Sequence, residues 1–216
     1  MAELILSHLP KTGGTWARFV LKNLINKTTG SVYDIHTVYG KTESSTIIGF
    51  VRNPWSWYVS LYNFNKWRLL SSSMHAFNSY GPEFWYLHPG SIRRLPKFED
   101  FIRVYAAPHI HTNISLNFES MPRWADAKTP LLETLYGDYI VPCDHVGKTE
   151  NLRCDLKTIL LTLDTLTPDL EERINTSKTQ NTAKKPTDYR TLYTDETAEL
   201  VFNTHQRIIT THDYSF

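Results

Sequence analysis

The chain has little cysteine, almost no net charge and no long apolar run. Only two cysteines, Cys143 and Cys154, occur among its 216 residues, which argues against a disulfide framework and is typical of a reducing compartment. Cys154 falls in a stretch of apolar periodicity, which predicts a small buried thiol. The formal net charge of +1 disfavours a nucleic-acid or anionic-membrane partner held by bulk electrostatics, so any anion site must be built locally.

No segment resembles a membrane anchor or a secretory leader. Apolar stretches stay well short of the roughly 20 residues of a membrane span, and residues 1–8 lack a basic region followed by a long apolar run. We therefore expect a soluble, cytoplasmic protein. The composition, 41% hydrophobic and 21% charged, is that of a globular protein, and neither a repeat nor a linker stands out, which predicts one domain over residues 1–216.

Apolar runs alternate with segments of helical periodicity. Leu4–Leu6 indicates a strand that enters a glycine-containing turn, after which apolar residues recur at helical spacing. The continuous apolar run Thr46–Val51 is typical of a buried parallel strand, and Asn53-Pro54 supplies an N-cap and a first-turn proline for another helix. Tyr139–Val141 is predicted to be a further strand. This alternation indicates an α/β fold with a parallel central sheet flanked by helices.

Later segments are predicted to be mainly helical. Apolar residues share one helical face over 98–105 and again over 152–163. The last helix has Thr194 as its N-cap and acidic residues in its first turn. The residues of this helix predicted to face inward are Ala198, Val201, Phe202, His205, Ile208 and Ile209. Residues 175–186 are polar and contain Lys184 and Lys185, which predicts a loop.

The turn after the first strand has the composition of an anion site. Pro10-Lys11-Thr12-Gly13-Gly14-Thr15-Trp16 joins a strand to a helix, and the N–H groups and positive dipole end of a helix N-terminus favour a phosphate. The two glycines allow close backbone approach, Thr15 adds a hydroxyl donor, and Lys11 adds a full positive charge. Because the lysine precedes the glycines, the turn departs from the G-x-x-x-x-G-K-[ST] loop of nucleotide triphosphatases, which weakens a kinase or ATPase interpretation.

A second cation stands at the end of the second strand. Arg52 leaves the carboxyl end of the predicted strand over Thr46–Val51, where ligands of open α/β sheets bind. Ser60 follows eight residues later, in the next predicted helix. A planar guanidinium and a hydroxyl together suit the oxygens of a phosphate group.

These two motifs, in this order, resemble those of the sulfotransferases that use 3'-phosphoadenosine 5'-phosphosulfate (PAPS). The turn is similar to the family's 5'-phosphosulfate loop, and Phe50-Val51-Arg52-Asn53-Pro54 with Ser60 is similar to its 3'-phosphate motif. The resemblance implies a P-loop-like sulfotransferase fold that binds PAPS, and its product adenosine 3',5'-bisphosphate (PAP), without a metal. It assigns donor binding to Lys11, Thr12, Gly13, Gly14, Thr15, Trp16, Arg52 and Ser60, and Lys11 would also be catalytic.

The acceptor hydroxyl needs a base, which the family takes from the region between the two motifs. Of the three candidates, Asp34, His36 and Glu43, we favour His36, because a neutral imidazole is abundant at pH 7. A hydrogen-bonded structural histidine is the competing interpretation. Lys184 and Lys185 either close over the donor, as a basic segment does in the family, or are simply solvated.

The sequence leaves alternatives for the acceptor molecule and for the type of activity. The form of the turn, Val146–Leu152 and Tyr214–Phe216 resemble carbohydrate-type members more than members that act on small phenols, which implies a glycan as acceptor. A nucleotide-dependent phosphotransferase is one competing function. A non-catalytic module that binds PAPS or PAP is another. The oligomeric state is not predicted.

Overall fold

The computed structural model describes residues 3–22, 27–29, 45–70, 97–106, 129–178 and 188–216. The chain divides into two compact units. The sheet unit comprises Met1–Arg52 and Tyr136–Pro186, and the helical unit comprises Asn53–Leu135 and Thr187–Phe216. The single domain expected from the sequence stays a prediction.

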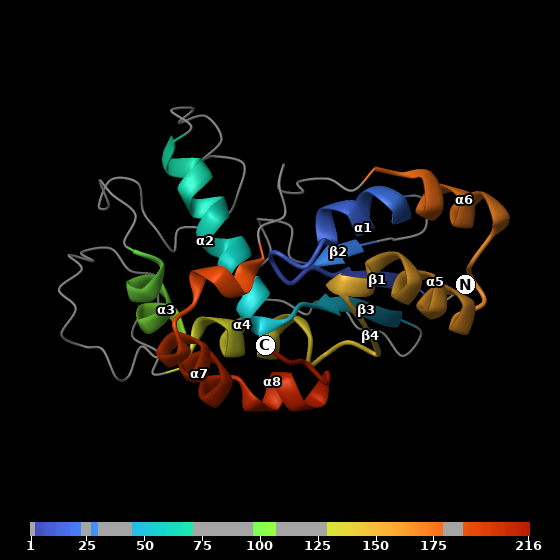
Figure 1. Ribbon diagram of the computed structural model, residues 1–216. Helices are drawn as coiled ribbons and strands as arrows, with labels where there is room; N and C mark the ends of the chain where they lie inside the picture. The colour runs from blue at the N-terminus through green and yellow to red at the C-terminus, as the bar shows by residue number, and fades with distance from the viewer. Residues whose placement is uncertain (1–2, 23–26, 30–44, 71–96, 107–128, 179–187) are drawn as a thin grey trace. The chain divides into compact units, whose positions relative to one another are not determined.

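Four parallel strands, in the order β2-β1-β3-β4, form the centre of the sheet unit (Figure 1). β1 (Glu3–Ser7) pairs with β2 (Lys27–Thr29) on one side and with β3 (Ser45–Val51) on the other. β4 (His145–Lys148) pairs with β3. The two strands predicted from apolar runs in the first 51 residues are confirmed, and so is an α/β fold with a parallel sheet.

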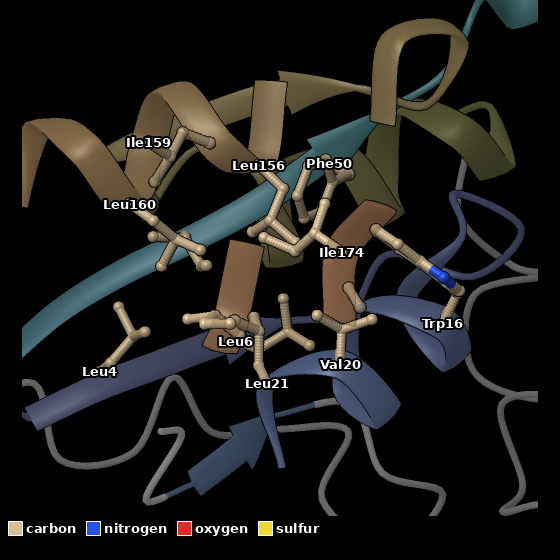
Figure 2. Close-up of a cluster of buried hydrophobic side chains, with 13 residues drawn as sticks. Leu4, Leu6, Trp16, Val20, Leu21, Phe50, Leu156, Ile159, Leu160 and Ile174 are labelled. Atoms are coloured by element: carbon tan, nitrogen blue, oxygen red, sulfur yellow. The ribbon is translucent and has the colours of Figure 1, made fainter. Parts of the chain in front are cut away.

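Three helices pack on one face of this sheet. Alternate residues of β1 and β3 point to the same face, where they meet α1 (Gly14–Leu21), α5 (Leu152–Thr162) and α6 (Pro168–Thr176). Figure 2 shows the resulting cluster of buried side chains. It consists of Leu4, Leu6, Trp16, Ala17, Val20, Leu21, Ile48, Phe50, Leu156, Ile159, Leu160, Leu170 and Ile174. This core holds α1 against the strand that precedes it and so fixes the two ends of the turn between them.

The segment Tyr139–Val141, predicted to be a strand, is the end of a helix. Tyr139 is the last residue of α4 (Leu131–Tyr139), and the N–H groups of Ile140 and Val141 both donate to the Tyr136 carbonyl, at 2.9 and 3.1 Å. The prediction was wrong because three consecutive apolar residues do not distinguish a strand from a buried helix end. The fourth strand, β4, lies a few residues further along.

The same segment packs on the second face of the sheet. The Ser7 hydroxyl donates to the Tyr139 carbonyl at 2.6 Å, and the Cys143 thiol donates to the same carbonyl at 3.1 Å. Gly49 of β3 leaves room for this approach, because a Cβ on it would lie 2.6 Å from the Cys143 sulfur. Both faces of β1 and β3 are therefore covered within the sheet unit.

The helical unit packs α2 (Pro54–Leu70), α3 (Phe98–Ala106) and α7 (Asp195–Thr204) against one another. Asn53 caps α2 as predicted, since its side-chain oxygen accepts hydrogen bonds from the N–H groups of Trp55 and Ser56 at 3.1 and 3.3 Å. The helix predicted over 98–105 is confirmed by α3. Many of the largest buried side chains of this unit are aromatic: Trp55, Trp57, Tyr58 and Phe101.

The predicted last helix is interrupted at His205. Thr194 caps α7 as expected, with its hydroxyl accepting a hydrogen bond from the Thr197 N–H, but α7 ends at Thr204 and α8 (Gln206–Thr211) follows. His205 is fully buried, its Nδ1 lies 2.9 Å from Glu133 Oε1, and its Nε2 lies 2.9 Å from the Tyr58 hydroxyl. Burial lowers the pKa of His205 despite this carboxylate.

Two predicted burials are wrong. Cys154 is exposed, because it lies on the side of α5 opposite Leu156 and Leu160, which form the apolar face. Phe202 is 45% exposed, whereas Val201 beside it is fully buried. Among the helices that the structure describes, none combines the length and the apolar character that crossing a bilayer requires.

Candidate functional site

The turn after β1 and the residues after β3 and β4 lie at one edge of the sheet. In a parallel sheet the carboxyl ends of all strands meet at the same edge, and ligands of such sheets bind there. The turn over 8–13, Arg52 and Thr149 each follow the end of one of these neighbouring strands. All three belong to the sheet unit.

The turn has an unusual backbone. Lys11 has φ 70° and Gly13 has φ 80°, both in the left-handed region, which is strained for a residue that carries a Cβ. Gly14 is needed because the His8 ring packs against it: a Cβ there would lie 2.0 Å from His8 Cδ2. Thr12 is buried, and its hydroxyl donates to the Leu9 carbonyl at 2.6 Å. The Thr12 side chain therefore holds the turn together.

The first turn of α1 offers backbone donors. Gly13 is its N-cap, and within the described part of the chain no side chain caps this helix end. The N–H groups of Trp16 and Ala17 both donate to the Gly13 carbonyl, at 3.0 and 3.1 Å. The N–H groups before them have no acceptor within the helix, and the helix dipole adds partial positive charge. Thr15 is exposed at this end of the helix. The arrangement suits an anion.

Lys11 and Arg52 bring two positive charges to this edge. The Arg52 guanidinium donates from Nη1 to the Lys11 carbonyl at 3.2 Å. Burial, and then the charge of Arg52, lower the pKa of Lys11 from 10.5 to about 8. Bringing together two cations in a partly buried place costs free energy, and an anion that binds beside them would offset this cost.

His8 adds no charge to this edge at neutral pH. Burial, followed by the charges of Arg18 and Lys11, lowers its pKa to about 4. Its packing against Gly14 agrees with a structural role as a core histidine.

Thr149 is a residue of the site that the sequence analysis missed. It begins the short 3₁₀ turn η4 (Thr149–Asn151), directly after β4. Its hydroxyl lies 2.8 Å from the Val51 carbonyl and 3.1 Å from the Thr12 carbonyl, so one hydroxyl contacts both the end of β3 and the turn after β1. In the sequence, Thr149 lies within the segment Val146–Leu152 noted above for its resemblance, but no feature of its own singles it out.

The side chain of Trp16 belongs to the core. Its indole Nε1–H donates to the Ser177 hydroxyl at 3.0 Å, and the Arg153 guanidinium lies 5.2 Å from the ring centroid. Arg153 also donates to the carbonyls of Ile174 and Ser177. Trp16 therefore joins the end of α6 to α1, and its packing helps to fix the start of α1.

The other predicted site residues lie outside the sheet unit or outside the described residues. Ser60 lies in α2, partly buried, within the helical unit. The base candidates Asp34, His36 and Glu43, together with Lys184 and Lys185, lie outside the described residues.

The chemistry available at the edge is that of an oxyanion site. Lys11, Arg52 and the backbone N–H groups of the turn and of the first turn of α1 lie at this edge. In the described ranges, no group of three or more His, Cys, Asp or Glu side chains is placed to hold a metal ion. Comparison with protein-family models, with curated proteins and with solved structures finds no significant match to this chain.

Proposed function

We propose that the protein is a sulfotransferase that moves a sulfuryl group from PAPS to an acceptor hydroxyl, with the P-loop-like sulfotransferase fold. The observation that carries the proposal is the closeness of two cationic residues at one turn: the Arg52 guanidinium donates to the backbone carbonyl of Lys11 at 3.2 Å, and the charge of Arg52 contributes to lowering the Lys11 pKa to about 8. A turn that concentrates charge in this way, at the carboxyl edge of a parallel sheet, fits a ligand with several anionic groups.

PAPS carries anionic groups on both sides of its ribose, which matches the two parts of the site. The 5'-phosphosulfate would lie against the first turn of α1 and Lys11, where backbone donors and a positive charge come together. Arg52 would hold the 3'-phosphate through its planar fork of donors. The share of Ser60 in that site rests on the sequence motif.

Transfer would proceed by in-line displacement. The acceptor oxygen forms a bond to sulfur while the bond from sulfur to the phosphate oxygen breaks, and the electron pair of that bond remains on the phosphate as PAP leaves. The acceptor proton passes to a base, for which His36 is the candidate from the sequence. Lys11, placed at the 5' side, would stabilise the charge that develops on the leaving oxygen. A glycan hydroxyl is the proposed acceptor.

Calorimetric titration with PAP and with adenosine 5'-monophosphate tests the donor assignment. We expect the intact protein to bind PAP more tightly than the monophosphate, and Arg52→Ala to remove most of this difference, since the 3'-phosphate loses its partner. Arg103→Ala is the matched control, because Arg103 pairs with Glu196 on the surface of the helical unit and belongs to neither of the two predicted phosphate motifs. Equal losses for both ligands in Arg52→Ala would contradict a 3'-phosphate role.

Two further measurements separate the competing functions. Tight binding of ATP with magnesium and no binding of PAP would favour a phosphotransferase and overturn the proposal. Incubation with radiolabelled PAPS and a library of glycans and alcohols then tests catalysis. Label in at least one acceptor is expected, whereas donor binding without transfer to any of them would indicate a non-catalytic module.

A further inference from the structure

We infer that Thr149 is a positioning residue that sets the direction of the backbone donors in the turn after β1; the ligand it serves rests on the function proposed above. The Thr149 hydroxyl carries a single proton and lies within hydrogen-bonding distance of two carbonyls, Val51 O at 2.8 Å and Thr12 O at 3.1 Å. It therefore ties the turn to the strand end that leads into Arg52. Its own location is fixed by the sheet, because Lys148 is in register with Val51.

The two contacted carbonyls of the turn determine where its N–H groups point. A trans peptide unit is planar, so the carbonyl of one residue and the N–H of the next point in opposite directions. The described residues contain no cis peptide bond. Arg52 holds the Lys11 carbonyl and Thr149 holds the Thr12 carbonyl. The N–H groups of Thr12 and Gly13 are thereby directed away from Arg52 and Thr149.

Of the peptides in the turn, the one between Thr12 and Gly13 can most easily rotate into the opposite orientation. Rotating it by half a turn would change φ of Gly13 from its positive value, and glycine tolerates φ of either sign at little cost. Lys11 carries a Cβ, so it does not share the freedom of glycine, and its own positive φ is strained. A hydrogen bond to the Thr12 carbonyl selects one of the two orientations. The turn then presents its donors to an oxyanion on one side and leaves Arg52 for a second anionic group on the other.

Thr149→Val and Thr149→Ser test this role. Valine removes the hydroxyl at nearly constant volume, and serine keeps it. We expect Thr149→Val to weaken binding of adenosine 5'-monophosphate by roughly two- to tenfold, the usual effect of one neutral hydrogen bond, and Thr149→Ser to restore it. Binding of adenosine 3'-monophosphate should weaken less, because its phosphate depends on Arg52, and the sheet holds the strand before Arg52 as well as Thr149 does. The control is Thr158→Val on α5, whose exposed hydroxyl donates to the Cys154 carbonyl.

The ligand pair separates positioning from general loosening. Equal weakening of the 5'- and 3'-monophosphates in Thr149→Val, or no weakening of either, would overturn the positioning role. Inorganic phosphate, titrated into the same variants, tests the turn without the nucleotide. If phosphate binding depends on the Thr149 hydroxyl but PAP does not bind the intact protein, the inference stands and the proposed function fails. If PAP binds the intact protein but Thr149→Val does not change the affinity for adenosine 5'-monophosphate, the proposed function stands and the inference fails. Binding of none of these ligands would overturn both.

Discussion

Replacing Lys11 by methionine should stabilise the unliganded protein while removing ligand binding. Lys11 is partly buried, and burial together with Arg52 lowers its pKa from 10.5 to about 8. A pKa lowered on folding means that the folded state disfavours the protonated amine, and a difference of this size corresponds to roughly 3 kcal/mol at pH 7. Methionine keeps a similar length without the charge, so the variant should be more stable by up to about 3 kcal/mol.

The stability gained by Lys11→Met should depend on pH. Below pH 8 the amine is charged in both the folded and the unfolded protein, and the full penalty is present. Between pH 8 and 10.5 the folded protein has lost the proton and the unfolded chain still holds it, so the penalty shrinks as pH rises. The advantage of Lys11→Met should therefore fall from about 3 kcal/mol at pH 7 to about 1.4 kcal/mol at pH 9.5.

Thermal unfolding at these two pH values, in buffers without phosphate or sulfate, is the assay. For a chain of this size, about 3 kcal/mol corresponds to a rise in Tm of roughly 6–12 °C at pH 7. Lys22→Met, at the exposed lysine directly after α1, is the control and should change stability by less than about 0.5 kcal/mol. A Lys11→Met protein no more stable than the original at pH 7, or equally stabilised at both pH values, would refute the assignment of a strained, desolvated charge to Lys11.

Three other predictions concern the same turn and the buried histidine of the helical unit. Affinity for PAP should be constant near pH 7 and fall up to tenfold per pH unit above about 8, as Lys11 of the unliganded protein loses its proton. Calorimetry at pH 8.5 in two buffers of different ionisation enthalpy should show proton uptake on binding. Gly14→Ala should destabilise by about 1–3 kcal/mol, because its Cβ would meet the His8 ring, and adding His8→Ala should recover part of this loss in a urea titration. Glu133→Ala should cost about 1–3 kcal/mol in the same titration, since it removes the partner of buried His205, and a neutral result would show that Nδ1 finds another acceptor.

The sequence was sufficient where a local pattern determines a local structure. The strand, turn and helix around Lys11 follow from an apolar run, two glycines and helical spacing. Asn53 and Pro54 predict the start of α2, and in the structure Asn53 caps this helix. The two cationic residues were also identified from the sequence, by residue type and position. In the structure, the Arg52 guanidinium donates to the Lys11 carbonyl at one edge of the sheet.

Prediction failed where the deciding contact comes from elsewhere in the chain. Tyr139 to Val141 have the composition of a strand, yet they end α4. The strand that follows, β4, is a shorter and more polar segment, which the apolar pattern did not reveal. The break at His205 lies inside a regular apolar pattern. Its position agrees with buried contacts to Glu133, 72 residues away, and to Tyr58, 147 residues away.

Thr149 illustrates the same limit at the site itself. A neutral hydroxyl after an edge strand carries no signal of its own, and its two acceptors belong to segments 98 and 137 residues earlier in the chain. The parallel registers of β1 with β3 and of β3 with β4 bring them together. Charged residues such as Lys11 can be recognised in a sequence because their cost must be met by a ligand or a partner. The neutral residues that orient the backbone around them depend on tertiary structure, and for that reason Thr149→Val, rather than a charge reversal, is the sharper test of how the turn is organised.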